Sequence, residues 1–369
     1  MILGVSAAGV ALIGGGTAWR VTRNPVSAVA PWQIDPTPPA DVRLDAFRYA
    51  ILAPNPHNRQ PWLIELVGRD TAVIRCDLAK RLPETDPYDR QITIGFGTFI
   101  ELARIAAAER GYAVAVTPFP ADEPQPRLDA RPVAKLVFRK IPGLVRDPLF
   151  AAITARRTNR EVYDATPPSA VQLRDVAAEG VTTSTDPALL AQMRPLAVGA
   201  MTTEVTTPRT WLESVRLFRI GHAEIDANPD GLAGRGPLLE GLQAVGMIDR
   251  QQLADPTSMA FKSGLDQVRA SCGSIPALIW IVTPGNSRVE QLDAGRRYAR
   301  ANLRATLLGL AMHPLSQALQ EYPEMAPAFA KVHALIGAAP GARLQMLARI
   351  GKGPTVPPAP RWPLETHLT

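Results

Sequence analysis

Apolar positions recur along the chain at spacings that predict alternating helices and strands. Those between residues 44 and 51 follow helical spacing, which predicts a helix over 42–52. This helix must stop at Ala53, because Pro54 disfavours helical geometry in the residue before it. The chain therefore opens its regular part with a helix that leads into a proline-rich loop.

A first series of elements follows this loop. The pattern predicts, in order, two strands that form a hairpin (63–67 and 72–76), a long alanine-rich helix (95–111) and two further strands (113–117 and 132–139). A second series is predicted as helices at 148–157 and 170–178, a buried strand at 275–283 and a long alanine-rich helix at 295–309. Between them, residues 205–265 show no regular pattern except an amphipathic segment around 211–218.

The two long helices indicate an internal repeat. Gly97–Gly111 and Gly295–Gly309 have equal length, and their aligned positions agree in size and polarity, as at Ala103 and Ala301. Such agreement favours a duplicated, pseudo-two-fold architecture. Unrelated alanine-rich helices can also agree in this way, so the repeat needs support from other features.

Composition narrows the class of protein. The 369 residues suffice for two cores, and 46% hydrophobic with 20% charged residues is an ordinary globular composition. The net charge is +6, but the arginines are scattered, so we expect an anionic cofactor as partner and no nucleic acid. Cys76 and Cys272 form no CxxC pair and the five histidines lack metal-ligand spacing, so we expect no metal site.

The first residues form a separate segment. Residues 1–19 are uncharged and mildly apolar, and Arg20 and Arg23 follow. This pattern indicates that 1–32 is an export signal or a membrane anchor with a linker after it. The sequence leaves open whether this segment is removed or retained, or whether it is an exposed or partner-packed helix. We expect the cell envelope as location if it is a signal, and the cytoplasm otherwise.

The loop at 54–62 combines rigidity with polar side chains. Three prolines stiffen its backbone, while Asn58 and Gln60 offer donors and acceptors. Such a loop suits the edge of a flat heterocycle. It equally suits a stiff helix-to-strand connection with solvated amides.

Residues 156–160 form a basic cluster, Arg-Arg-Thr-Asn-Arg. Planar, permanently charged guanidinium groups and a hydroxyl make a good phosphate cradle. A solvated basic helix end, stabilised by the helix dipole, is the alternative that the residues leave open.

Three segments together resemble the nitroreductase superfamily of flavoproteins. Residues 53–62 resemble its loop A-P-S-x-H-N-x-Q-P-W, residues 156–160 are similar to its FMN-phosphate motif R-x-S-x-[RK], and residues 310–317 resemble the segment after its central helix. The order of these motifs, together with Asp86-Pro87-Tyr88-Asp89-Arg90, resembles the Acg-like branch, in which two nitroreductase folds are fused. The similarity runs from about residue 42 to 363.

The resemblance implies an α+β protein of two nitroreductase-like α/β halves, fused as an intramolecular pseudo-dimer around one FMN. The halves would be 40–145 and 146–369, the second with a C-terminal arm. The implied cofactor contacts are Pro54, Asn55, Pro56, Asn58 and Gln60 on the ring, Arg156, Thr158 and Arg160 from the phosphate motif, Leu315, Ser316 and Gln317 near the reactive N5, and Arg361 toward the phosphate. Arg160 would stabilise the reduced flavin.

Some positions depart from the family pattern. Asn55 replaces the usual serine, Trp362 replaces a second arginine of the arm, and Ser316 stands where classical members often carry glutamate. Phosphate affinity and the hydrogen bond at N5 are therefore expected to differ from those of the family. The chain also lacks a Gly-rich dinucleotide fingerprint.

These features predict an FMN-dependent oxidoreductase that passes electrons through flavin N5 to a nitro compound, a quinone or a similar acceptor. The donor would be NAD(P)H or another small molecule, and no side chain is nominated as catalytic. The alternatives are a protein that binds or sequesters FMN with little turnover, and a membrane-anchored protein whose flavin site has decayed. We expect a monomer or a weak homo-oligomer, with membrane attachment through residues 1–19 as an option.

Overall fold

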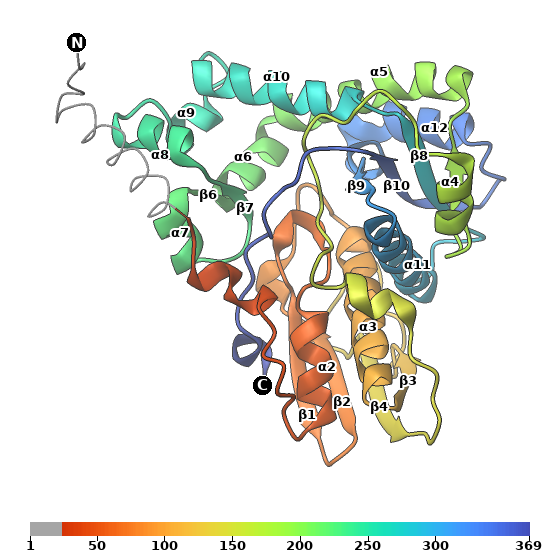
Figure 1. The fold of residues 1–369 in the computed structure, drawn as a ribbon. Helices are drawn as coiled ribbons and strands as arrows, with labels where there is room; N and C mark the ends of the chain where they lie inside the picture. The colour runs from red at the N-terminus through yellow and green to blue at the C-terminus, as the bar shows by residue number, and fades with distance from the viewer. Residues whose placement is uncertain (1–23) are drawn as a thin grey trace, which may run out of the picture.

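The computed structural model describes residues 24–369, and the expected signal or anchor at 1–19 lies outside this part. The described chain is a mixed helix-and-sheet fold with two four-stranded antiparallel sheets (Figure 1). The first sheet has the order β1 (Trp62–Val67), β2 (Thr71–Cys76), β4 (Ala134–Lys140), β3 (Tyr112–Pro118). The second has the order β5 (Thr182–Ser184), β8 (Ala277–Thr283), β10 (Arg343–Gly351), β9 (Ala311–Pro314).

Helices cover these sheets and fill the space between them. Those of the first part are α2 (Val42–Ala50) and α3 (Arg90–Glu109). Those of the second part are α4 (Ala170–Ala177), α5 (Pro187–Thr206), α10 (Met259–Gly273), α11 (Arg288–Leu307) and α12 (Ala326–Leu335). A side layer contains α6 (Pro208–Leu217), α7 (Gly221–Ala227), α8 (Pro237–Ala244), α9 (Arg250–Ala254) and the short parallel pair β6 (Phe218–Ile220) and β7 (Leu232–Gly234) (Figure 1).

Helices α3 and α11 pack directly on each other between the two sheets (Figure 1). A Cβ built on Gly97 would lie 2.1 Å from the carbonyl oxygen of Leu292, and one built on Gly295 would lie 2.0 Å from that of Ile94. The two backbones therefore touch, and only glycine permits this approach. The glycines that mark the repeat in the sequence are the contact points of the two helices.

The first residue of each of these two helices is an arginine that binds a carbonyl near the other sheet. Arg90, at the start of α3, donates from Nη2 to the carbonyl of Leu319 (2.7 Å). Arg288, at the start of α11, donates from Nη2 to the carbonyl of Pro126 (2.9 Å). A cation at a helix N-terminus opposes the helix dipole, so these carbonyl bonds compensate an unfavourable position. Each of these buried arginines thus links residues near one sheet to residues near the other sheet.

Most predicted elements are confirmed. The hairpin, the strands at 113–117, 132–139 and 275–283, and the helix at 170–178 occur within a few residues of the expected bounds. The long helices are confirmed but begin earlier, α3 at Arg90 and α11 at Arg288. Their first turns were hidden because buried polar and charged residues interrupt the apolar spacing there.

Two expectations are wrong. The helix at 148–157 is only the 3₁₀ helix η4 (Pro148–Ala152), after which the chain turns and becomes irregular. Arg157 contributes to this, because its Nη1 donates to the carbonyls of Thr154 and Arg156. The region 205–265 is not irregular but consists mainly of short helices, packed around a small core that includes Val215, Ile220 and Leu253.

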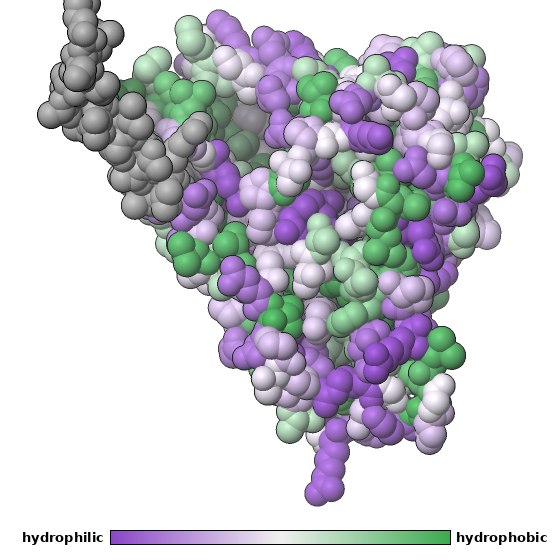
Figure 2. Space-filling model, in the orientation of Figure 1, coloured by the Kyte–Doolittle hydropathy of each residue, from purple (hydrophilic) through white to green (hydrophobic). Residues whose placement is uncertain are grey.

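The surface is mixed in polarity. On the face shown in Figure 2, polar and apolar side chains occur in small interspersed groups. Between residues 24 and 369, no helix combines the length and hydropathy needed to cross a membrane.

Candidate functional site

The loop at 54–62 has a constrained backbone. His57, Asn58 and Gln60 have φ angles of 46°, 53° and 51°, a left-handed conformation that is uncommon outside glycine. The loop is fixed internally, since the Gln60 N–H donates to the Asn55 side-chain oxygen at 2.8 Å. Backbone held in sparsely populated conformations concentrates at functional sites, which directs attention to this loop.

The amides of Asn58 and Gln60 bind the protein's own backbone. Asn58 Nδ2 donates to the carbonyl of Pro360 (3.0 Å), and Gln60 Nε2 donates to that of Pro229 (2.8 Å). Gln60 Oε1 accepts from the Trp362 N–H (3.0 Å). The structure thus uses these side chains to hold the C-terminal arm and the segment at 229, which differs from the expected contact with a heterocycle.

Residues 54–56 lie against α3. Thr98 Oγ1, on that helix, donates to the carbonyl of Pro54 at 2.7 Å. A Cβ built on Gly95 would lie 3.3 Å from both Asn55 Cβ and Pro56 Cδ. The start of the loop is therefore packed tightly on the helix that crosses α11.

Three arginines lie over the indole of Trp32 and a fourth lies near one of them; we call these four the arginine cluster. They are Arg156, Arg157, Arg235 and Arg361. The Trp32 ring centroid lies 4.6 Å from the guanidinium carbon of Arg157, 5.3 Å from that of Arg361 and 5.8 Å from that of Arg156. Burial and the nearby charge of Arg157 lower the pKa of Arg235, which places this fourth arginine in the same group.

The arginine cluster lacks a compensating anion. Within residues 24–369, none of its members has a carboxylate at ion-pair distance. Arg156 is 2% exposed, and burial lowers its pKa to about 10. In the same described part, the buried Nε of Arg156 and hydroxyl of Tyr298 have no hydrogen-bond partner. Unsatisfied buried donors beside uncompensated charge are the signature of an anion site.

Arg361 is buried and donates to backbone carbonyls at the end of α2. Its Nε binds the carbonyl of Ile51 (2.8 Å), and its Nη2 binds those of Leu52 (3.1 Å) and Ala53 (3.0 Å). Its Nη1 donates to Asn58 Oδ1 (2.5 Å). The carbonyl end of a helix favours such a cation. Arg361 thus positions the loop and α2 in this structure, and its contact with a phosphate stays a prediction.

Arg160 differs from Arg156 in its exposure. Its side chain is exposed, yet the surrounding protein desolvates it enough to lower the pKa of the guanidinium. It has no hydrogen bond or ion pair through this group with any residue from 24 to 369. Its charge acts on His57 from the loop, on Tyr298 from α11 and on Glu204 from α5. Arg160 therefore stands where segments distant in sequence converge.

His57 lies within reach of the charge of Arg160 and is in its neutral form. Burial first, and then the charges of Arg160 and Arg59, lower the pKa of His57 to about 4. Its Nε2 lies 3.1 Å from Ser214 Oγ on α6. At neutral pH the ring can donate or accept a hydrogen bond but carries no charge.

The segment 315–317 contributes unequally to the site. Gln317 lowers the pKa of the buried carboxyl of Glu204, and Ser316 is half-buried. Leu315 is 2% exposed and packs in the second hydrophobic core, while its N–H donates to the carbonyl of Leu347. The expectation that Leu315 approaches a cofactor is wrong for its side chain, because the sheet directs it inward.

Thr158 lies between the two key arginines in sequence. Its side chain is half-buried and forms no hydrogen bond with any residue of the described part. Its hydroxyl is therefore free for the phosphate contact that the motif predicts.

The sequence did not reveal four contributors to the site: Trp32, Glu204, Arg235 and Tyr298. Trp32 stands in the segment interpreted as a linker, and Glu204 and Arg235 stand next to or within the unassigned region. Tyr298 lies in the second long helix, where the repeat gives only a partial signal. No local motif marks any of them, since the fold alone brings them together.

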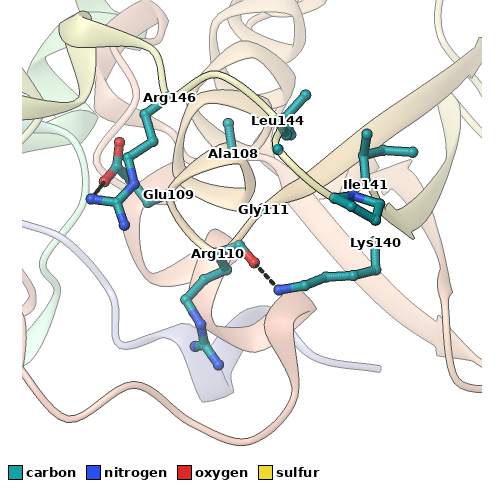
Figure 3. A pocket seen from close by; sticks show the side chains of 10 residues that line it. Ala108, Glu109, Arg110, Gly111, Lys140, Ile141, Leu144 and Arg146 are labelled. Atoms are coloured by element: carbon teal, nitrogen blue, oxygen red, sulfur yellow. Dashed lines mark hydrogen bonds and ion pairs between the residues drawn. The ribbon is translucent and has the colours of Figure 1, made fainter.

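A separate hollow of about 420 Å³ lies away from the site, at the end of α3 (Figure 3). Its basic side chains already have partners, because Lys140 Nζ donates to the Arg110 carbonyl and Arg146 pairs with Glu109 at 3.8 Å (Figure 3). It carries no convergent chemistry comparable to that around Arg160. Residues 24–369 also contain no group of three His, Cys, Asp or Glu side chains suited to a metal ion.

Comparison with known proteins supplies an independent line of argument. No protein-family model matches the chain. Two provisionally named NAD(P)H nitroreductases, from Mycobacterium tuberculosis strains CDC 1551 / Oshkosh and H37Rv, are each 26% identical over 332 residues, which covers 88% of this chain and 90% of theirs.

Solved structures give weaker matches. A protein of Anabaena variabilis, provisionally described as a nitroreductase, matches 90% of this chain and 95% of its own with a TM-score of 0.47 and 10% identity. A nitroreductase with bound FMN from Bacteroides fragilis matches 57% of this chain and 90% of its own with a TM-score of 0.32 and 13% identity. Over most of its length the chain is therefore similar to two proteins that are named as nitroreductases.

Proposed function

We propose that this protein is an FMN-dependent oxidoreductase of the nitroreductase type. Its acceptor is an organic molecule such as a nitro compound or a quinone, and its donor is NAD(P)H or another small molecule. The curated relatives are named for NAD(P)H-dependent nitro reduction, and one solved match contains FMN. Two observations on the described residues 24–369 carry the proposal: the arginine cluster has no carboxylate at ion-pair distance there, and the guanidinium of Arg160 has no partner there.

The residues fit the two ends of FMN. The arginine cluster and the free Thr158 hydroxyl suit a phosphate, which would also accept from the unsatisfied Nε of Arg156 and hydroxyl of Tyr298. Arg160 suits the electron-poor edge of the ring, where a cation stabilises negative charge. Because Tyr298 interacts with both Arg156 and Arg160, the two ends of the site are linked through α11.

FMN, when bound, supplies hydride and single-electron chemistry at its ring. The chain's own residues supply position and electrostatics. Arg160 would supply a positive charge, and neutral His57, which feels that charge, would offer a hydrogen bond. Gln317 and Ser316 stand where the resemblance puts the reactive side of the ring.

We also propose that the chain is a fused pair of nitroreductase-like halves, of the Acg-like branch, divided near residues 145 and 146. The reciprocal arrangement of Arg90 and Arg288 and the contact of Gly97 with Gly295 support this division. A pair of equivalent halves would produce such matched contacts across a pseudo-two-fold axis. The site then draws on both halves, with His57 from the first and Arg160 from the second.

Steady-state oxidation of NADH or NADPH by the purified, FMN-loaded protein tests the activity. We expect turnover with a nitroaromatic compound or a quinone as acceptor, measured by the loss of absorbance of the reduced nicotinamide. If no turnover is seen, a sample reduced with dithionite is mixed with each acceptor. This shows whether reduction by the donor or reoxidation by the acceptor is the step that fails. If acceptors reoxidise the reduced protein but NAD(P)H does not reduce it, the physiological donor is a different molecule.

The second candidate is FMN binding or sequestration with little turnover. One feature favours it: the segment 229–231 is bonded onto the loop, with Gly231 N–H donating to the Asn58 carbonyl (3.3 Å). Buried Asp230 strengthens this attachment by pairing with Arg59 at 2.9 Å and Lys80 at 2.8 Å. A protein with stoichiometric FMN that neither oxidises NAD(P)H nor reoxidises with any acceptor supports sequestration and excludes the oxidoreductase.

A further inference from the structure

Arg349 is a buried cation on β10, inside the second sheet. It is 0% exposed, and within residues 24–369 no carboxylate lies at ion-pair distance from it. Its Nε donates to Nδ1 of His313 (3.1 Å), the residue opposite it on β9. Because an arginine is always protonated in a protein, this nitrogen of His313 accepts and the ring is neutral. A buried charge without a counter-ion is unfavourable unless hydrogen bonds satisfy it, so the contacts of the other two nitrogens matter.

These nitrogens bind the chain on both sides of Arg160. Nη2 of Arg349 donates to the carbonyl of Glu161 (2.7 Å) and, at a longer distance, to that of Asn159 (3.5 Å). The same nitrogen donates to Ser271 Oγ (2.8 Å), and this hydroxyl in turn donates to the carbonyl of Arg160. Arg349 therefore reaches the backbone of residues 159–161, either directly or through one hydroxyl.

Two further residues fix the guanidinium of Arg349. Its Nη1 donates to the hydroxyl and to the carbonyl (3.2 Å) of Ser274, directly after α10. Its guanidinium carbon lies 3.8 Å from the centroid of the Tyr163 ring, and the Tyr163 hydroxyl donates to the carbonyl of Asn159 (2.8 Å). All three nitrogens of Arg349 thus have partners. A planar fork suits this set of contacts, whereas a lysine ammonium carries no such fixed donors.

The same contacts join two of the segments that resemble the nitroreductase superfamily, 156–160 and 310–317. His313 belongs to the second segment, and the Asn159 N–H donates to the carbonyl of Met312 (3.1 Å) in that segment. Within residues 24–369 the guanidinium of Arg160 has no partner, so only its backbone is held. A free side chain on a fixed backbone can present its charge at a defined place.

We propose that Arg349 is a positioning residue for Arg160: its buried guanidinium fixes the backbone at 159–161, so that the free guanidinium of Arg160 meets the edge of a flavin ring. The inference rests on the proposed function, because it takes FMN as the molecule that Arg160 binds. In this role Arg349 acts through Arg160 and needs no contact with FMN of its own. A cation at the ring edge favours the reduced form, so a displaced Arg160 should lower the affinity for reduced FMN relative to oxidised FMN.

The midpoint potential of bound FMN tests this role, because it reports the ratio of these two affinities. It is measured on the full-length, FMN-loaded protein by redox titration against a reference dye. Arg160→Ala sets the reference and should lower the ratio at least about tenfold, since a charge-assisted contact is lost. Arg349→Lys keeps the charge but not the fork, and should lower the ratio about threefold or more. In the Arg160→Ala background, Arg349→Lys should have no further effect on the ratio.

Ser271→Ala is a milder variant, because it removes only the hydroxyl between the two arginines. It should lower the ratio in wild type and leave it unchanged in the Arg160→Ala background. Circular dichroism verifies folding, and Ser271→Ala carries the test if Arg349→Lys does not fold.

Thr283→Val is the matched control for the loss of a buried hydroxyl. Thr283 is buried on β8, and its hydroxyl also donates to a carbonyl, that of Gly285 (2.7 Å), and accepts from a side-chain amide (3.0 Å). It has no contact with residues 159–161 among its hydrogen bonds within 24–369. Thr283→Val should keep the wild-type midpoint potential even where it lowers thermal stability.

The outcomes separate this inference from the proposed function. An effect of Arg349→Lys or Ser271→Ala that is equally large without Arg160 overturns the inference, since these residues would then act on packing or on the flavin by another route. A wild-type potential in both variants, together with a lowered one in Arg160→Ala, also overturns it and leaves the proposed function intact. Failure of the wild-type protein to bind FMN contradicts the proposed function itself, and the inference falls with it.

Discussion

Arg156 and Arg361 donate to the same carbonyl oxygen, that of Leu52, at 3.0 and 3.1 Å. Each also lies over one indole ring, that of Trp32. Two buried guanidinium groups so close together repel each other, and burial lowers the pKa of both. Carbonyl dipoles and the aromatic face offset part of this cost, and a bound dianion would offset much more.

Alanine at both Arg156 and Arg160 should therefore release FMN. Each charge-assisted contact contributes about 1.5–3 kcal/mol, so the double variant should weaken binding at least about a hundredfold. The measurement is FMN fluorescence quenching, with circular dichroism to verify folding. Alanine at Arg174, an exposed arginine on α4, is the control and should bind FMN normally. Unchanged affinity in the double variant would refute the assignment of these arginines.

Glu204 also affects stability, with a predictable dependence on pH. Its pKa is raised in the folded state from 4.5 to about 7, so its favourable contribution exists at acidic pH and disappears as the pH rises through 7. At pH 8 the FMN-free protein carries a buried carboxylate. Glu204→Gln should then be more stable than wild type by up to about 3 kcal/mol, and near pH 4.5 the two proteins should be similar.

Urea denaturation of both FMN-free proteins at pH 4.5 and pH 8 measures this difference. Equal stabilisation at the two pH values would show that the substitution acts through packing and not through the charge.

At the residue scale, the sequence identified those parts of the site that form contiguous motifs. Arg156, Thr158 and Arg160 stand together in the chain, so their chemistry could be predicted locally. Trp32 and Tyr298 are brought near this segment only by the fold, and no local sequence pattern predicts their proximity. The direction of a side chain was also out of reach, as Leu315 shows, because the pairing of β9 with β10 decides which side faces the core.

Among the elements, the crossing of α3 and α11 is the most constrained. Alanine at Gly97 or Gly295 would place a methyl group about 2 Å from a carbonyl oxygen of the partner helix. Neither backbone can yield without separating the helices, so each substitution should lower the free energy of unfolding by about 3 kcal/mol or more.

Gly199→Ala provides the matched control, because this glycine lies inside α5 with open space around it. Alanine there should raise the free energy of unfolding by about 0.5–1 kcal/mol. Thermal unfolding of the three variants is sufficient to compare them. A mild effect at both Gly97 and Gly295 would mean that the helices do not meet as closely as described.

Element prediction succeeded where periodicity was long or turns were marked. The hairpin across Gly68 was predictable because a turn separates two alternating apolar runs. The region 205–265 was not predictable, because its helices are short and their apolar faces cover only a small local core. Their caps, such as Asp249 and Ser258, are visible mainly once the helices are known.

For the whole molecule, the crossed helices α3 and α11 and the reciprocal arginines link the surroundings of the two sheets. The loop with His57 comes from the chain before residue 145, and Arg160 comes after it. The repeat in the sequence correctly marked the two helices that join these parts. Trp32, near the start of the described chain, donates to the carbonyl of Ala359 in the C-terminal arm, and both lie at the arginine cluster. No single segment of the sequence could indicate this contact.

The most direct test of the account is the number of FMN molecules that the purified full-length protein binds. Its absorbance spectrum and a titration with FMN, followed by ultrafiltration, give this number without any assumption about donor or acceptor. The account predicts the yellow spectrum of a bound flavin at one FMN per chain, abolished by alanine at Arg156 and Arg160. A colourless protein that fails to retain added FMN, or one that binds it equally well without these arginines, would contradict it.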